Sequence, residues 1–263
     1  MQKSFSQWFL GLALVGYAIG CLVLVFILSR YPLSGEIDND LLTSNTLLPD
    51  LTLINQPLER VELFVGIMRP LVEQKNQLLL STRERLLQIK QEVDQNRELG
   101  FVDREQLNRL REDFFVDAET YPSNEQAVEV LLSRVDIIPP AMVIAQAAIE
   151  SGWGTSTFAQ EGNNLFGEWC YKKGCGIVPK RRAASATHEV RKFDSIEDSI
   201  NAYYRNINTH NAYRNLRDLR TTIRHDESKF TARNLVAGLG KYCGRGEVYI
   251  TEVRSLIKAR KLE

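Results

Sequence analysis

The stretch "IPPAMVIAQAAIESGWG", residues 138–154, constrains the fold more than any other part of the chain. Pro139 and Pro140 suit the first turn of a helix, and Gly152 suits the position just after its end. Between these positions almost every residue is small or apolar, which is typical of a helix that is buried on all sides. The sequence therefore predicts a buried helix that ends near Gly152.

The exception in this helix is Glu150, which falls in its last turn. A carboxylate there meets the negative end of the helix dipole, and neighbours such as Ile149 and Trp153 would shield it from water. Both effects raise the pKa of a carboxyl group. A carboxyl that keeps its proton near neutral pH can serve as a general acid. The alternative is an exposed glutamate at a helix end without a function.

Amides and aromatic rings follow Glu150 within about twenty residues, and this combination suits a sugar chain. Amides donate and accept hydrogen bonds to hydroxyl groups, while flat aromatic faces cover the apolar faces of sugar rings. The alternative is a small aromatic core beneath a loop. The candidate substrate-binding residues are Trp153, Asn163, Asn164, Phe166, Trp169 and Tyr171.

Long helical patterns precede the buried helix. Residues 58–93 carry apolar side chains at helical spacing with charges between them, and Pro70 should kink this helix or divide it. A membrane-proximal stalk, a helix packed on the domain and a coiled-coil dimer are all compatible with the pattern. Two further helices are expected to begin near Asp103 and near Ser123 or Asn124.

Between Gly162 and Lys192 the pattern changes, because glycines and a proline interrupt the helices. The segment "THEVRKF", residues 187–193, has strand character. We expect a small lobe with one β-hairpin here, followed by helices up to the C-terminus. The predicted fold class is mainly α.

Residues 8–28 form a run of 21 residues without a charge. A helix rises about 1.5 Å per residue, so this run is long enough for a hydrocarbon core of about 30 Å. The apolar part of a secretory signal is shorter, about 7–15 residues, which favours an uncleaved transmembrane anchor. Cleavage after residues 18–20, or lipid attachment at Cys21, is the alternative.

The charges that flank this run are nearly balanced, with Lys3 before it and Arg30 after it. We expect the N-terminus to lie in the cytoplasm and the remainder in the periplasm, so that the protein is a single-pass inner-membrane protein. A cleaved periplasmic form is the alternative. Residues 29–57 contain several prolines in an acidic setting and are expected to form a linker.

The charge and cysteine content narrow the possible ligands. Lys plus Arg and Asp plus Glu are both 33, and a nucleic-acid-binding protein would usually be clearly basic, so no nucleic-acid partner is expected. Cys170 and Cys175 bracket a turn-like stretch and could form a disulfide in an oxidising compartment, which leaves Cys243 odd. The spacing of Cys and His matches no zinc motif, so no metal and no cofactor are expected.

The motif "VIAQAAIESGWG", followed closely by "NNLFG", resembles a signature of bacterial glucosaminidases in the lysozyme-like superfamily. The resemblance extends over residues 120–262, although its last part, "KYCGRGEVYITEVRSLI", is loose. The layout of a membrane segment, a helical region and this domain resembles the bacterial Bax family. A lysozyme-like α domain with a small β lobe is what this resemblance implies.

The resemblance implies roles for particular residues. Glu150 matches the general acid of the family, and Glu189 in "THEV" resembles its second carboxylate, on the β lobe. Tyr242 resembles a tyrosine near the acid. After "NLFG" the family usually continues with an apolar residue and lysine, whereas Glu168 stands here. Glu168 is therefore a rival for the second carboxylate.

The resemblance implies a peptidoglycan hydrolase that cleaves β-1,4 bonds at N-acetylglucosamine, with glycan strands as its partner. The second carboxylate would activate water or stabilise an oxocarbenium-like transition state, and assistance by the substrate's N-acetyl group is a further route. The alternatives are a peptidoglycan amidase and a non-catalytic wall-binding scaffold. The predicted divisions are an anchor at 1–28, a linker at 29–57, a helical membrane-proximal region at 58–118 and the glucosaminidase domain at 119–263.

Overall fold

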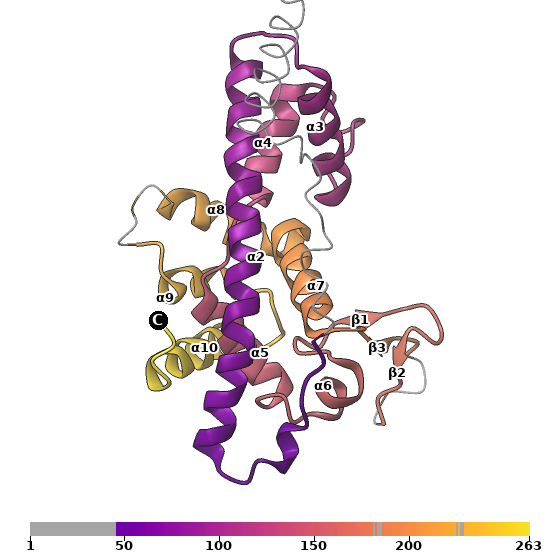
Figure 1. Ribbon diagram of the computed structural model, residues 1–263, viewed down its shortest axis with the longest axis vertical. Helices are drawn as coiled ribbons and strands as arrows, with labels where there is room; N and C mark the ends of the chain where they lie inside the picture. Colours follow the sequence, from indigo (N-terminus) through magenta and orange to yellow (C-terminus); the bar gives the residue numbers. More distant parts are fainter. Residues whose placement is uncertain (1–45, 181, 183–185, 225, 227–228) are drawn as a thin grey trace, which may run out of the picture. The chain divides into compact units, whose positions relative to one another are not determined.

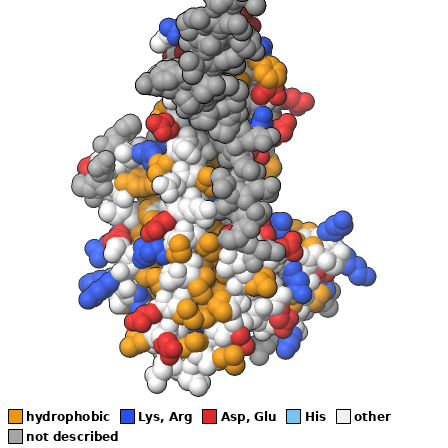
Figure 2. Space-filling model, in the orientation of Figure 1, with side chains coloured by type: hydrophobic (Ala, Val, Ile, Leu, Met, Phe, Trp, Pro, Cys, Tyr) orange, Lys and Arg blue, Asp and Glu red, His pale blue; other side chains and the backbone are white. Residues whose placement is uncertain are grey.

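The computed structural model describes residues 46–180, 182, 186–224, 226 and 229–263 (Figure 1). The predicted anchor lies outside these residues. In the part of the chain that is described, no helix combines the length and the apolar character needed to cross a membrane. On the face drawn in Figure 2, acidic and basic side chains are interspersed, in keeping with the balanced charge of the sequence.

The described part is mainly helical, as predicted, with one small sheet. The N-terminal helices and the helix that carries Glu150 are η2 (Leu51–Leu53), α2 (Pro57–Asp94), α3 (Phe101–Asp113), α4 (Asn124–Arg134) and α5 (Pro140–Ser151). The elements of the lobe are α6 (Thr157–Gly162), β1 (Trp169–Cys170), β2 (Gly176–Ile177) and β3 (Glu189–Arg191). The C-terminal elements are α7 (Ile196–Thr209), η3 (Asn211–Tyr213), α8 (Arg214–Ile223), α9 (Ala232–Leu235), η4 (Val236–Leu239) and α10 (Glu247–Ala259).

The helix α5 lies at the centre of the core, as its sequence predicts. Pro140 opens it, and Gly152 ends it in the left-handed conformation, with φ of 58°. Nine of its twelve residues are buried, because α2, α9 and α10 pack around it. Glu150 is therefore attached to one of the most firmly held elements of the protein.

The long helix α2 packs on the domain, which is one of the three arrangements that its pattern allowed. Its buried side chains form one stripe, which includes Phe64, Met68 and Val72, and it contacts α4, α5 and α7 (Figure 1). Pro70 does not divide the helix. This residue is exposed, so the Gly66 carbonyl that loses its intrahelical partner lies on the solvent side, where water can replace the missing N–H.

Part of the predicted linker also packs on the domain. The Thr46 carbonyl accepts a hydrogen bond from the Ile196 amide at 3.0 Å, and the Leu48 amide donates to Asn163 Oδ1 at 3.2 Å. Leu51 is fully buried. The described residues from 46 onward belong to one compact unit, so the helical region and the predicted catalytic domain share one core.

The β lobe has three antiparallel strands in the order β1-β3-β2 rather than a single hairpin. Trp169 pairs with Val190, and Ile177 pairs with the same residue from the other side. Two of the strands are only two residues long, which is too short to produce the alternation by which a strand is found in a sequence. The lobe joins α6 to α7 and lies beside them (Figure 1).

Candidate active site

Glu150 lies in the last turn of α5 and is half-buried. Burial raises the pKa of its carboxyl group, and the nearby charge of Glu252 adds to this effect. A hydrogen bond from Tyr249 and the charge of Arg245 act in the opposite direction. The net result is a carboxyl group that holds its proton more firmly than an exposed glutamate does.

The chain passes close to this carboxylate at Gly167. Glu150 Oε2 lies 4.0 Å from the point that a Cβ atom on Gly167 would occupy, and Gly167 has φ of +71°. Side chains rarely adopt this backbone conformation, so glycine is the residue that lets the segment after Phe166 turn here. The "NNLFG" motif thereby brings the β lobe directly beside the candidate acid.

A cluster of tyrosines forms the other side of the site. The rings of Tyr242 and Tyr249 stack with centroids 5.1 Å apart, and Tyr213 lies 6.1 Å from Tyr242. Gln146 donates to the Tyr249 hydroxyl at 3.1 Å, and the Tyr242 hydroxyl donates to the Phe166 carbonyl at 3.4 Å. Burial raises the pKa of Tyr242, so its hydroxyl stays protonated and can act as a donor.

The sequence reasoning chose Tyr242 and missed Tyr249, although Tyr249 is the tyrosine that donates a hydrogen bond to Glu150. Both lie in the C-terminal segment, where Tyr249 occupies a fully buried position on α10. Its apolar surroundings in the sequence are those of an ordinary core tyrosine. Its role becomes visible only when α10 packs against α5, and the sequence alone does not show that these two helices are in contact.

Asn164 holds the first strand of the lobe in place. Its side-chain nitrogen donates to the carbonyls of Glu168 and Arg191, each at 2.9 Å, and its oxygen accepts from the Glu168 amide at 3.0 Å. Asn163 makes a similar link, from its nitrogen to the Phe193 carbonyl at 3.0 Å. Both amides, predicted as substrate-binding, are thus already engaged within the protein, and Asn164 is only 2% exposed.

The predicted aromatic residues separate into two groups. Phe166 is buried and stacks on Tyr203 at 4.2 Å, so it belongs to the core. Trp153 is half-buried with its ring 5.7 Å from that of Phe64. Trp169 and Tyr171 are exposed, at 55% and 73%, and remain available to a ligand.

Trp169 does not stand alone, because its ring stacks on His188 with centroids 4.0 Å apart and an angle of 13° between the planes. The pair forms a flat, partly exposed surface on the lobe next to Glu168. His188 was not among the predicted site residues. His188 directly precedes β3 and lies nineteen residues from Trp169 in the chain. Nothing in the sequence therefore indicates that the two rings are in contact.

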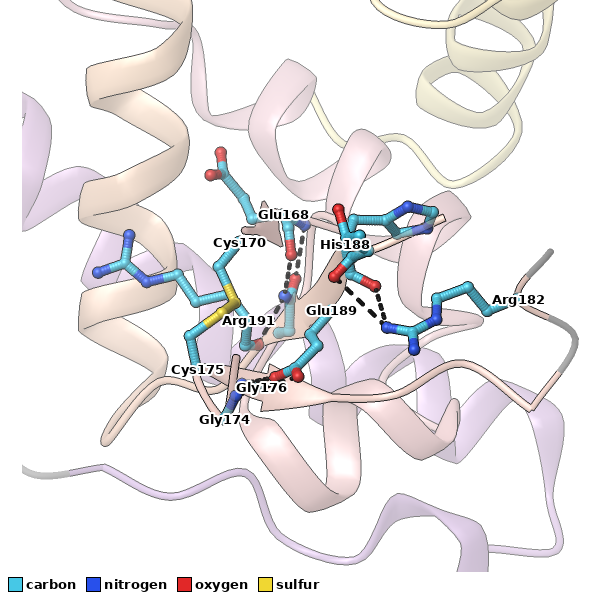
Figure 3. Close-up of a disulfide and its surroundings, with 11 residues drawn as sticks. Glu168, Cys170, Gly174, Cys175, Gly176, Arg182, His188, Glu189 and Arg191 are labelled. Carbon is cyan, nitrogen blue, oxygen red and sulfur yellow. Dashed lines mark hydrogen bonds between the residues drawn. A yellow bond between two sulfur atoms is a disulfide. The ribbon is translucent and has the colours of Figure 1, made fainter. Parts of the chain in front are cut away.

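Glu189, the predicted second carboxylate, is 5% exposed and lies at the start of β3. Its two oxygens accept hydrogen bonds from the amides of Gly174 and Gly176, at 3.0 and 2.9 Å (Figure 3). These two bonds lower the pKa of the Glu189 carboxyl group. The carboxylate is therefore turned toward the loop between β1 and β2 and holds that loop against β3.

That loop is also closed by a disulfide between Cys170 and Cys175, which the sequence allowed. The sulfur atoms and a Glu189 oxygen lie within 4.8 Å of one another. Metal binding by such a group requires thiolates, and both sulfurs are used in the disulfide. Cys243 is a free cysteine in the described part of the chain.

Glu168 directly follows Gly167, and its side chain extends toward α7, away from the Glu189 carboxylate (Figure 3). Glu168 Oε1 accepts a hydrogen bond from Asn206 Nδ2 at 3.3 Å. Burial raises the pKa of its carboxyl group, while the charges of Arg191 and Arg205 lower it. Glu168 is half-buried, whereas Glu189 is 5% exposed and bonded through both of its oxygens to the disulfide loop.

A model of the family described as mannosyl-glycoprotein endo-beta-N-acetylglucosaminidase matches residues 125–262, which is more than half of the chain. The chain therefore belongs to the glucosaminidase family. Among curated proteins, Protein bax of Escherichia coli (strain K12) is 41% identical over 119 residues. That match covers 45% of this chain and 42% of the relative, less than half of each. The resemblance to Bax-type proteins with a glucosaminidase domain is confirmed.

Among solved structures, the catalytic domain of the autolysin Auto from Listeria monocytogenes matches with 20% identity and a TM-score of 0.36. The match covers 63% of this chain and 88% of that one.

Proposed function

We propose that this protein is a peptidoglycan hydrolase that cleaves β-1,4 glycosidic bonds at N-acetylglucosamine. The observation that carries the proposal is Glu150, a half-buried carboxyl group with a raised pKa at the end of a rigid helix, inside the motif of a glucosaminidase family. A carboxyl group in this state can deliver a proton to a leaving sugar oxygen. The exposed rings of Trp169 and Tyr171 support a sugar-chain substrate.

In the proposed reaction Glu150 gives its proton to the glycosidic oxygen while the bond from that oxygen to C1 breaks. The oxygen keeps the electron pair of that bond and leaves as a hydroxyl group. Water adds at C1, and its surplus proton passes to a second carboxylate. The buried hydroxyl of Tyr249 donates to Glu150 and helps to fix its orientation.

The test uses Glu150→Gln, which removes the transferable proton and keeps the size of the side chain. General acid catalysis contributes about 10²–10⁴-fold, so release of glycan fragments from purified wall should fall by at least about 100-fold. Mass spectrometry of the products identifies the bond that is cut. Release of free amines without new reducing ends would indicate an amidase, and no release by the wild type would indicate a scaffold.

We also propose that residues 8–28 anchor the protein in the inner membrane, with the catalytic domain in the periplasm. The uncharged run supports this proposal, because it is long enough to span a bilayer. The disulfide supports it as well, since disulfides persist in oxidising compartments. A reporter that is active only in the periplasm, fused after Glu263, should be active. A well-expressed but inactive fusion would refute this topology.

A further inference from the structure

We propose that Glu168, not Glu189, is the carboxylate that accepts the proton of the attacking water. The inference rests on the proposed glycan hydrolysis and assigns its second catalytic residue. Three observations carry it: the hydrogen bonds that occupy Glu189, the approach of Glu168 to the acid, and the firm support of the Glu168 backbone.

The first observation concerns Glu189. Both of its oxygens accept backbone N–H groups of the disulfide loop, and the residue is almost completely buried. To act on a water molecule elsewhere on the lobe, this carboxylate would have to give up both hydrogen bonds to the disulfide loop. Hydrogen bonds to a charged group are stronger than those between neutral groups, so such a movement is costly. Glu189 is suited to hold the loop.

The second observation is the position of Glu168 relative to Glu150. The Glu150 carboxylate lies beside Gly167, which is the residue directly before Glu168. Tyr213 in η3 experiences the negative charge of both glutamates, and together with burial these charges raise its pKa to about 12. Both carboxylates are thus near enough to Tyr213 for their charges to act on it. Glu168 is half-buried, so water can reach it.

The third observation is how firmly Glu168 is placed. Its amide and its carbonyl are both held by Asn164, and the carbonyl also accepts from the Arg191 amide at 2.9 Å. The side chain contacts Asn206 on α7. A base must lie within hydrogen-bonding reach of the proton that it removes, and this backbone support fixes where it can lie.

The charges around Glu168 suit a base. Arg191 from β3 and Arg205 from α7 favour its ionised form, whereas burial opposes ionisation and makes the carboxylate more basic than an exposed one. The negative charge of Glu168 also acts on Tyr213, as does that of Glu150. In each turnover Glu150 loses one proton to the leaving sugar and Glu168 gains one from water, and exchange with solvent restores both.

The experiment compares Glu168→Gln with Glu189→Gln and Glu161→Gln in the full chain, using purified wall as the substrate. Glu161 is an exposed glutamate on α6 and controls for the loss of one negative charge. We expect Glu168→Gln to lower turnover by about 10²–10⁴-fold. Glu161→Gln should keep the wild-type rate, and Glu189→Gln should keep at least a tenth of it.

Rescue of activity by azide distinguishes a catalytic base from a residue that only supports the structure. In Glu168→Ala a water molecule lacks its base, but azide can attack C1 without one, so added azide should restore cleavage and produce a glycosyl azide. Loss of activity without azide rescue would overturn the proposal, and so would more than a tenth of normal activity in Glu168→Gln. If azide instead rescued Glu189→Ala, the second carboxylate would be Glu189.

Failure of this inference can be distinguished from failure of the proposed function. A wild-type protein that releases no glycan fragments contradicts both. An active wild type, an inactive Glu150→Gln and an active Glu168→Gln contradict only the role of Glu168. Should Glu168→Ala fold poorly, Glu168→Gln keeps the contact with Asn206 and decides the question by its rate.

Discussion

At the scale of the residue, Glu150 is held between opposing influences. Burial disfavours its charge, while Tyr249 and Arg245 favour it, and burial is the largest effect. A carboxylate whose pKa is raised by folding binds its proton more tightly in the folded protein than in the unfolded chain. The protonated group therefore contributes its full stabilisation at pH values below the pKa that it has in the unfolded chain. This stabilisation is lost as the pH rises through the higher pKa that it has in the folded protein.

Glu150→Gln should therefore stabilise the protein at high pH. At pH 8 the wild type must hold a partly buried negative charge that glutamine lacks, so the variant should melt at a higher temperature. Near pH 4 the wild-type residue is protonated, and the difference should shrink. Thermal melts of both proteins at the two pH values provide the measurement. A lower melting temperature of the variant at pH 8 would show that Arg245 outweighs burial.

Sequence reasoning located Glu150 because the helix that carries it is marked by prolines, a glycine and a continuous apolar run. It could not decide what the amides of Asn163 and Asn164 do. Their partners include Arg191 and Phe193, which are 27 and 30 residues away along the chain. An amide that binds a sugar and an amide that links two loops look the same in a sequence, because only the fold brings the partners together.

At the scale of the element, the β lobe is held by features that do not depend on strand length. The strands β1 and β2 pair only two residues each with β3. The disulfide and the Glu189 carboxylate fasten the intervening loop to this sheet. The sequence reasoning found the strand at β3 and the bracketing cysteines. It missed the third strand because pairs of two residues leave no periodic pattern.

Removal of the disulfide should loosen this lobe and leave the helical core folded. Cys170→Ser with Cys175→Ser opens a short loop, and the chain-entropy relation gives a loss of about 2 kcal/mol. We expect a modest fall in melting temperature and faster proteolysis between β1 and β2. Cys243→Ser is the control, since that cysteine is free in the described structure and lies outside the lobe. Unchanged proteolysis of the double variant would show that Glu189 alone holds the loop.

The helix α2 shows a different limit of sequence reasoning. Its apolar side chains predicted a helix over residues 58–93, and the structure has one from 57 to 94. The same stripe of apolar residues would serve a stalk, a dimer or a packed helix, so the pattern could not specify the partner. The polar residue Asn76 provides the specific information. It is buried in the stripe and bonds to both backbone groups of Ile138 and to the Tyr204 hydroxyl.

At the scale of the whole molecule, one buried charge cluster joins segments that are distant in the chain. Asp136, which is 2% exposed, lies just before α5 and contacts Arg83 of α2 at 3.5 Å. It also contacts Arg220 of α8 at 3.7 Å and Arg224, directly after α8, at 2.7 Å. Through this carboxylate the long helix α2, the segment just before α5 and the C-terminal end of α8 are connected.

Asp136→Asn should therefore destabilise the whole unit. The substitution leaves Arg220, which is 1% exposed, without its main charge partner, and removal of one member of a buried ion pair costs about 3–5 kcal/mol. The matched control is Asp94→Asn, because Asp94 pairs with Lys90 at 3.0 Å on the surface. Loss of an exposed pair costs about 1 kcal/mol or less. Urea unfolding of the two variants measures both free energies.

The two variants also show whether α2 and the helices that pack around α5 unfold together. If they form one cooperative unit, a single transition should shift to lower urea concentration in Asp136→Asn, with both the helical signal and the tyrosine and tryptophan fluorescence changing at the same midpoint. Two separated transitions would indicate that α2 unfolds by itself. If Asp136→Asn and Asp94→Asn lower the free energy of unfolding equally, backbone carbonyls are sufficient hydrogen-bond partners for the buried arginines. One such carbonyl is that of Val135, which accepts a hydrogen bond from Arg83 at 2.9 Å.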